Sequence, residues 1–266
     1  MSNIDLWPFS NPFLDSKLRY QFSNKYVKGK VLDYNFSSHM AYSGSKILLD
    51  SDATEVWHHN ISEKNTICMI RKHGENDSID YNLIENQKFT ENSFDCLVSF
   101  DTLLFVKNRV DVLKTFSSII KNDGFAIVSI PNLRLLDYPI YKKFNLGKNY
   151  LKEEFLADLQ KYFEIELYSL IFKTDSNKKP ELGSKIVNEP QLLLLKSLRK
   201  PIKFFASKVD KNFNFFELHM KDKYTELIDY DKKKTSKEIE IVPSKQATNS
   251  NSLYYIAVAK KILKNN

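Results

Sequence analysis

The feature of this sequence that most constrains its fold is a pair of buried strands joined by one helix, within residues 94–130. Residues 94–100 and 125–130 are near-continuous apolar runs, as in strands buried on both faces of a parallel sheet. Between them, residues 110–120 place apolar side chains at helical spacing, and residues 121–124 (KNDG) are typical of a helix end. Parallel neighbours need such a crossover, so this stretch predicts a strand–helix–strand unit.

The same alternation of strands and helices continues along most of the chain. Further strands are expected at residues 30–34, 54–59, 79–83 and 164–172. Further helices are expected at residues 14–26, 40–49, 62–74 and 151–163. Because crossovers between parallel strands are right-handed, this alternation predicts an α/β fold with a doubly wound sheet and helices on both faces.

One long segment breaks this alternation. It contains a polar turn region, a basic helical stretch and a charged run, before a last strand at residues 252–261. The chain is therefore divided into an N-terminal helical segment (1–28), an α/β core (29–172), a basic helical insertion or lid (173–252) and a final strand with its tail (253–266).

The composition indicates a globular protein without covalent cross-links. In a chain of 266 residues, 42% hydrophobic residues are ample for a core. Cys68 and Cys96 stand far apart without motif spacing, so neither a disulfide framework nor a zinc cluster is expected. Cys96 is interpreted as a core residue. No apolar run approaches the ~20 residues of a membrane span, and the first residues lack the pattern of a secretion signal. We therefore expect a soluble, cytoplasmic protein.

The order and spacing of residues 88–132 resemble the second half of the nucleotide-binding fold of class I S-adenosylmethionine-dependent methyltransferases. The resemblance is carried by SFDCLVSFDTL at residues 93–103 and KNDGFAIVSIPN at residues 121–132. The matching first half, residues 31–63, stands where that family carries its glycine-rich cofactor loop. The resemblance therefore implies the Rossmann-like fold of this family.

The resemblance covers about residues 15–172 and 252–261. The family has a late antiparallel strand at the edge of its sheet, so the resemblance implies that residues 253–266 supply a final edge strand. Residues 173–252 would then be an insertion on the last hairpin. The expected sheet has seven strands, most of them parallel.

The resemblance also implies a site for S-adenosylmethionine beyond the carboxyl ends of the strands. In the family, the loop after the first strand reads D-x-G-x-G-x-G, because glycines let the backbone turn sharply and approach the cofactor. The corresponding residues here are Asp33, Tyr34, Asn35, Phe36, Ser37, Ser38 and His39. The acid is retained and the glycines are absent, which describes a degenerate cofactor motif.

Two acidic positions of the family's site also differ. The acid that ends the second strand and binds the ribose corresponds to Asn60, which lacks the charge that strengthens such hydrogen bonds unless Glu63 compensates. The acid near the adenine corresponds to about Asn82 or Leu83, neither of them acidic, with Asp80 and Glu85 close by as alternatives. The candidate cofactor-binding residues are Asp33, Tyr34, Asn35, Ser37, Asn60, Ile61 and Ser99.

Methyl transfer chiefly requires that donor and nucleophile be held aligned, although an oxygen nucleophile also benefits from a base. Asp101 and His59 are the candidates for that base, because both are expected near strand ends. Asn132 and Tyr150 are candidates for the acceptor side. The favoured interpretations are nevertheless structural. They make Asp101 a helix cap, His59 a strand-end surface residue and Tyr150 a packing residue.

A metal site is not expected. His58 and His59 are adjacent, and consecutive strand residues point to opposite faces, so the two cannot chelate one ion from a regular strand.

Residues 191–211 contain an amphipathic basic stretch, with apolar side chains spaced three and four apart and lysines largely on the other side. Contact with an anionic membrane surface is one interpretation. We favour a lid that packs its apolar stripe on the sheet, with a homodimer contact left open. The formal charge of +7 is ascribed to a soluble surface, and a nucleic-acid partner is the least favoured hypothesis.

Two functional hypotheses follow. The first is a methyltransferase that uses S-adenosylmethionine to O-methylate a sugar, glycan or other small acceptor, as the resemblance of residues 131–172 to such enzymes implies. The alternative is a catalytically inactive pseudo-methyltransferase that acts as a binding or assembly partner. It rests on the three departures from the family's cofactor site.

Overall fold

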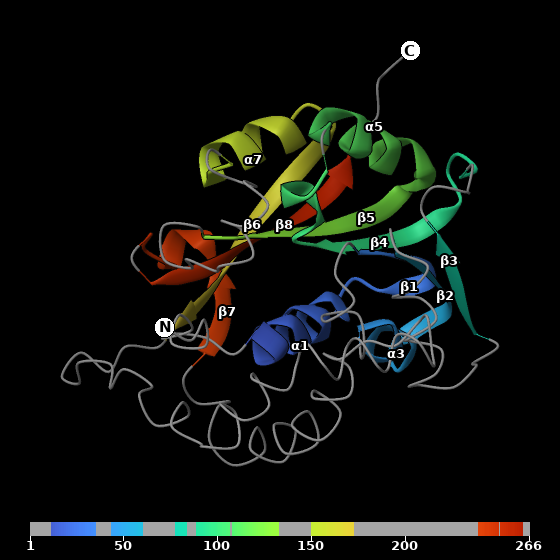
Figure 1. The fold of residues 1–266 in the computed structure, drawn as a ribbon, viewed down its shortest axis with the longest axis horizontal. Coiled ribbons are helices and arrows are strands. Elements are labelled where there is room, and N and C mark those ends of the chain that lie inside the picture. Colours follow the sequence, from blue (N-terminus) through green and yellow to red (C-terminus); the bar gives the residue numbers. More distant parts are fainter. Residues whose placement is uncertain are drawn as a thin grey trace, which may run out of the picture.

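The computed structural model describes residues 12–35, 44–60, 78–83, 89–106, 108–132, 150–172, 239–249 and 251–262. Within these residues, eight strands form one mixed sheet. Helices α1 and α3 cover one face of the sheet, and α5 and α7 cover the other (Figure 1). This arrangement confirms the predicted α/β fold with helices on both faces.

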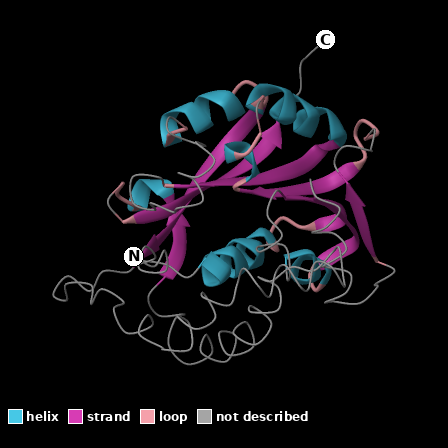
Figure 2. Cartoon of the chain, in the orientation of Figure 1, coloured by secondary structure: helices cyan, strands magenta, loops and turns pink. Residues whose placement is uncertain are grey.

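The elements follow the expected order along the chain, and Figure 2 distinguishes the helices from the strands. The strands are β1 (Lys28–Asn35), β2 (Asp52–Asn60), β3 (Ile79–Leu83), β4 (Phe94–Phe100), β5 (Ile120–Pro131), β6 (Phe163–Phe172), β7 (Ile239–Pro243) and β8 (Ser252–Lys261). The helices are α1 (Pro12–Ser23), α3 (Gly44–Leu49), α5 (Arg109–Ile119) and α7 (Lys152–Leu159), with single turns η2 (Thr102–Leu104) and η3 (Ser244–Gln246). The helix expected at 62–74 and the basic stretch at 191–211 lie outside the described residues.

The strand order in the sheet is β3-β2-β1-β4-β5-β8-β6-β7. The pairs among β1 to β5 are parallel, whereas β8 is antiparallel to both β5 and β6. The chain moves outward from β1 to β3 and then returns to place β4 beside β1. This reversal confirms the doubly wound topology and puts the expected ligand position at the carboxyl ends of β1 and β4.

The position of the last strand differs from the prediction. β8 is not an edge strand, because it lies between β5 and β6. Its first eight residues are all buried, as a strand covered on both faces requires, whereas a natural edge usually carries polar residues.

The edge of the sheet is formed instead by β7, an eighth strand that the sequence analysis did not predict. It comes from the segment interpreted as a helical insertion and pairs antiparallel with β6 from Ile239 opposite Phe172 to Pro243 opposite Tyr168. A second small correction concerns residues 121–124, which belong to β5 because α5 ends at Ile119 and the strand begins at once.

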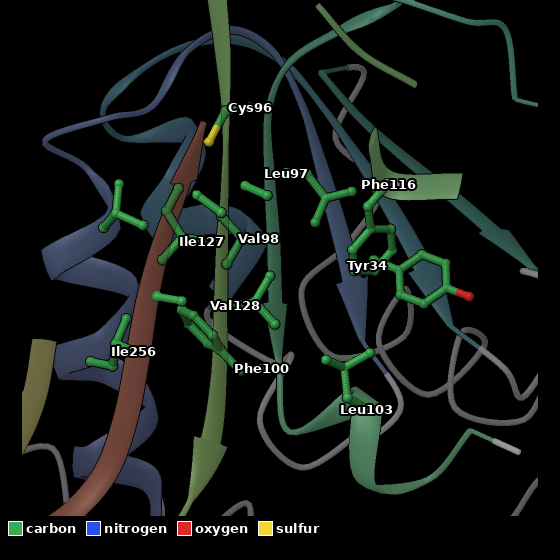
Figure 3. Close-up of a cluster of buried hydrophobic side chains, with 14 of the residues drawn as sticks. Tyr34, Cys96, Leu97, Val98, Phe100, Leu103, Phe116, Ile127, Val128 and Ile256 are labelled. Carbon is green, nitrogen blue, oxygen red and sulfur yellow. The ribbon is translucent and has the colours of Figure 1, made fainter. Parts of the chain in front are cut away.

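The core lies on both faces of the central strands. Figure 3 shows Val98, Ile127 and Ile256 together with Leu97 and Val128, each of them fully or nearly fully buried. Burying one such side chain contributes about 1.5–3 kcal/mol, which makes the central sheet a rigid support for residues at its ends. Cys96 is also fully buried, which confirms its interpretation as a core residue, and burial raises the pKa of its thiol. No helix in the described part of the chain is long and apolar enough to cross a membrane.

Candidate functional site

The carboxyl ends of β1, β2 and β4 lie side by side, and we call the position beyond them, where doubly wound folds bind ligands, the donor crevice. Asp33 of β1 is paired with His58 of β2 on one side and with Val98 of β4 on the other. Two residues further on, Asn35 and Asn60 end neighbouring strands at paired positions. The structure therefore brings together two predicted cofactor contacts. Ser37 and Ile61 lie outside the described residues.

Asp33 is fully buried, and its carboxylate is held by hydrogen bonds within the protein. The Tyr20 hydroxyl of α1 donates to Oδ1 at 2.9 Å, and the Ser45 hydroxyl of α3 donates to Oδ2 at 2.6 Å. His58 Nδ1 lies 3.2 Å from the same Oδ2 and 3.0 Å from Ser45 Oγ. Asp33 therefore joins α1 and α3 to β1 and β2, in the wall behind the crevice.

The next residue along β1, Tyr34, is also largely buried. Its ring packs edge-to-face on Phe116 of α5, with centroids 5.0 Å apart, and burial raises the pKa of its hydroxyl (Figure 3). Ser99, on β4, is fully buried, and its Oγ has no hydrogen-bond partner in the described part of the chain. A buried hydroxyl without a partner is unfavourable, so Ser99 Oγ is a candidate contact for a polar ligand group.

Asp101 directly follows β4 and forms a buried ion pair that the sequence analysis did not predict. Arg19 of α1 donates from Nη1 to Oδ1 at 2.9 Å and from Nη2 to Oδ2 at 3.1 Å. Burial alone would lower the pKa of Arg19, but the nearby Asp101 more than offsets this and raises it, so the guanidinium stays charged.

This pair changes the interpretation of Asp101. Asp101 occupies the N-cap position of η2, as the cap interpretation expected, but its side chain makes no capping hydrogen bond and binds Arg19 instead. Service as a base would require breaking the buried pair, and breaking such pairs typically costs about 3–5 kcal/mol. Arg19 stands in a helix that also carries Asp15, Lys17 and Gln21, so the sequence does not reveal its partner 82 residues away.

His59 is fully buried, so its interpretation as a surface residue is wrong. Its ring is nearly parallel to that of Trp57, with centroids 6.1 Å apart, and lies 4.9 Å from that of Phe89. Neither ring nitrogen has a hydrogen-bond partner among the described residues. Burial, helped by the neighbouring His58, lowers the pKa of His59 to about 4, so the imidazole is neutral at pH 7. The two histidines have separate surroundings, as expected for adjacent strand residues.

A pocket lies at the same edge of the sheet, where β5 ends and α7 begins. We call it the β5–α7 pocket, and it is lined by Pro131, Asn132, Tyr150, Leu151, Lys152, Glu153, Asn249 and Tyr255. Asn132 and Tyr150, both predicted on the acceptor side, therefore share one pocket. Because β4 and β5 are parallel neighbours, this pocket and the donor crevice open at the same end of the sheet.

The walls of the β5–α7 pocket are fixed by hydrogen bonds and ring contacts. The Asn132 amide donates to the backbone oxygens of Asn249 at 3.0 Å and Ser252 at 2.8 Å. Tyr150 is buried, with the Arg109 guanidinium 3.9 Å from its ring centre, which confirms its packing role. Burial and the nearby Asp158 raise the pKa of Tyr150, so its hydroxyl is neutral at physiological pH.

The comparison with protein families agrees with this geometry. A family model described as a methyltransferase domain matches residues 43–128, from the start of α3 into β5. Residues 43–128 are therefore similar to a methyltransferase domain. The matched span contains β2 and β4, whose ends form two sides of the donor crevice. No curated protein matches the chain.

Solved structures share the fold of this chain. The [4+2]-cyclase SpnF is 15% identical, with a TM-score of 0.53 over 93% of this chain and 82% of its own. The MccD protein is 14% identical, with a TM-score of 0.52 over 95% of this chain and 100% of its own. A methyltransferase from Thermotoga maritima, described as a possible histamine N-methyltransferase, is 16% identical, with a TM-score of 0.50 over 94% and 92%. At these identities the likeness concerns the fold, which hosts more than one kind of chemistry.

Proposed function

We propose that this chain is a methyltransferase that transfers a methyl group from S-adenosylmethionine to an oxygen atom of a sugar, glycan or similar small acceptor. The observation that carries the proposal is the placement of the donor crevice and the polar β5–α7 pocket at one edge of the sheet. In doubly wound folds, ligands bind at this edge, where the strand order reverses.

The residues at the donor crevice fit a cofactor that carries a ribose. Asn35 and Asn60 end adjacent strands, and an amide can both donate to and accept from hydroxyl groups. Ser99 Oγ is buried without a partner among the described residues, as a group reserved for a ligand would be. Asp33 fits less directly, because Tyr20 and Ser45 already donate to its carboxylate.

When bound, S-adenosylmethionine supplies an electrophilic methyl group on a positively charged sulfur. The residues of this chain would then align the acceptor oxygen with that methyl group, because alignment supplies much of the rate enhancement in such transfers. We assign no base, because Asp101 is held by Arg19 and His59 is buried against the rings of Trp57 and Phe89.

The β5–α7 pocket has room for about one water molecule, and its polar lining favours contact with hydroxyl groups at its mouth. It contains two asparagines, Asn132 and Asn249, and a lysine, Lys152, whose Nζ lies 5.2 Å from the ring centre of Tyr255. Amide and ammonium groups bind hydroxyl groups through directed hydrogen bonds, and a tyrosine ring offers an apolar face for the carbon skeleton.

Calorimetry with S-adenosylmethionine and S-adenosylhomocysteine tests the donor half of the proposal. We expect saturable binding by both, followed by release of S-adenosylhomocysteine when a panel of neutral and charged sugars is added. If neither compound produces a heat of binding at millimolar concentration, the hypothesis that this chain is an enzyme is wrong. The catalytically inactive binding partner, which the engaged Asp33 carboxylate also favours, would then be the better description.

A further inference from the structure

We propose that Arg19 of α1 is a positioning residue for the donor crevice, which it acts on through Asp101 and the turn η2. The inference rests on the proposed function, because it concerns the crevice that would hold the methyl donor. It extends the site to the N-terminal helix, which lies outside the span matched by the family model.

The first step in the argument is the geometry of Arg19, which is fully buried. Arg19 makes two further hydrogen bonds besides those to Asp101. Nη1 donates to Ser129 Oγ of β5 at 2.6 Å, and Nε donates to the backbone oxygen of Asp15 at 3.2 Å. The guanidinium carbon lies 4.0 Å from the ring centre of Tyr254. A planar group held in its plane by hydrogen bonds and above it by a ring has one orientation, and a lysine could not reproduce it.

The second step is the backbone of Asp101. Its φ of 63° and ψ of −2° lie in the left-handed region, which residues other than glycine rarely adopt. Its backbone amide donates to the backbone oxygen of Ser129 at 2.9 Å. The side chain of Asp101 is therefore fixed by Arg19 and its backbone by Ser129. A sparsely populated conformation persists when its surroundings determine it, and Arg19 is the main such contact.

The third step leads from this turn to the crevice. Thr102, the next residue, donates from Oγ1 to the backbone oxygen of Tyr34 at 3.1 Å. Tyr34 precedes Asn35, the last residue of β1, where the family's cofactor loop begins. A continuous set of contacts therefore runs from Arg19 through Asp101 and Thr102 to the end of β1.

A role limited to stability explains this arrangement poorly. Replacing a buried ion pair with well-packed apolar residues is often neutral or stabilising, because the pair loses much of its hydration on burial. Buried pairs are better suited to selecting one conformation, and this one selects the conformation of the turn between β4 and the crevice.

The test compares Arg19→Lys and Thr102→Val with wild type and with Ile119→Val, a core control at the opposite end of the sheet. Hydrogen exchange is followed at the amides of Asp101, Leu104 and Phe105, which bond within or beside the turn. The amides of Asn92 and Ser93, which bond to residues at the end of α5, serve as internal references. S-adenosylhomocysteine is titrated into the same four proteins.

We expect Arg19→Lys to speed exchange at the turn amides by about tenfold or more while the reference amides change by less than about twofold. Its Kd for S-adenosylhomocysteine should rise by about tenfold, and that of Thr102→Val by about threefold, with Ile119→Val unchanged. Equal acceleration at both sets of amides, or an unchanged Kd beside a loosened turn, would overturn the proposal.

Two further outcomes separate this inference from the proposed function. If Arg19→Lys does not fold, Thr102→Val keeps the test open, because it removes only the hydroxyl that bonds to the Tyr34 and Phe100 backbone oxygens and leaves the ion pair in place. A wild-type protein that binds no S-adenosylhomocysteine would refute the proposed function and the role of Arg19 in donor binding together. The exchange data would then still show whether Arg19 orders the turn.

Discussion

The ring of Tyr20 lies where a side chain at Gly44 would have to be. A Cβ at Gly44 would stand 2.2 Å from Tyr20 Cζ and 2.6 Å from its hydroxyl oxygen. That hydroxyl is the donor to Asp33 Oδ1, so the absence of a side chain at the start of α3 lets α1 reach the end of β1. In this chain, a glycine outside the expected cofactor loop permits close packing beside the donor crevice.

Gly44→Ala should therefore destabilise the protein by about 1–3 kcal/mol, because the added methyl group forces Tyr20 out of its place. Denaturant unfolding measures the change. Lys46→Ala, on an exposed position of the same helix, is the control and should stay within about 0.5 kcal/mol of wild type. If Gly44→Ala proved as stable as this control, the described contact between α1 and α3 would be wrong.

Tyr20→Phe should cost about 1–2 kcal/mol, because it removes one donor from the buried Asp33 carboxylate and leaves the ring in place. The matched control is Tyr162→Phe, whose hydroxyl makes no hydrogen bond within the described part of the chain. The two variants should differ in the free energy of unfolding at neutral pH. A loss of equal size in both would mean that the Tyr20 hydroxyl has no special part in holding Asp33.

Stability should fall as the pH is lowered through the range in which His59 titrates. The folded protein holds the pKa of His59 at about 4, against 6.5 for an unperturbed histidine, because the ring is buried. Between these values the unfolded chain binds a proton that the folded protein does not, so the contribution is complete above pH 6.5 and is lost towards pH 4. The loss is on the order of 2–3 kcal/mol.

The measurement is the difference in unfolding free energy between wild type and His59→Phe at pH 7 and at pH 4.5. Carboxylates titrate in both proteins, so the difference isolates the histidine. His59→Phe should show the flatter pH profile. Parallel profiles would mean that the ring is hydrated in solution.

Asn60→Asp should tighten binding of S-adenosylhomocysteine, because a carboxylate at the end of β2 accepts hydrogen bonds from ribose hydroxyls about twice as strongly as an amide does. Calorimetry should show a Kd about three- to tenfold lower. Asn92→Asp, at the opposite end of the sheet beside Lys261, is the control and should leave the Kd unchanged. A Kd that does not respond to Asn60→Asp would show that the ribose lies elsewhere.

Asn132→Ala should affect the acceptor more than the donor. The substitution removes the bonds to the Asn249 and Ser252 oxygens and releases one wall of the β5–α7 pocket. We expect the KM for the acceptor to rise by about tenfold, with the affinity for S-adenosylhomocysteine unchanged. Steady-state kinetics with varied acceptor measure the first value and calorimetry the second. A change confined to donor affinity would place the acceptor elsewhere.

The fold could be predicted from the sequence where burial leaves a direct mark on composition. The apolar runs of β4 and β5, with an amphipathic helix between them, are sufficient to indicate a parallel pair joined by a crossover. The position of β8 could not be obtained this way, because a fully apolar strand fits several interior places in a sheet. β7 was missed because the strand has only five residues and most of them are only half-buried.

The candidate site was less predictable, because its decisive contacts join distant parts of the chain. Asp33 was identified from its place in a family motif, but its partner Tyr20 lies on a helix that the motif does not include. The pairing of Arg19 with Asp101 spans 82 residues, and nothing local in the sequence distinguishes it from a helix cap. The burial of His59 depends on Phe89, which comes from beyond the next strand.

The interior place of β8 sets a condition on how this protein assembles. Asn132 and Ser252, which are joined by a hydrogen bond, are 120 residues apart along the chain. During synthesis, β5 therefore emerges from the ribosome well before β8, a strand with which it pairs. Until then β5 and β6 each present an unpaired apolar edge, the kind of surface through which nascent chains aggregate. A chain truncated before Ser252 would keep that edge permanently, and we expect it to be recovered in inclusion bodies rather than as a smaller folded domain.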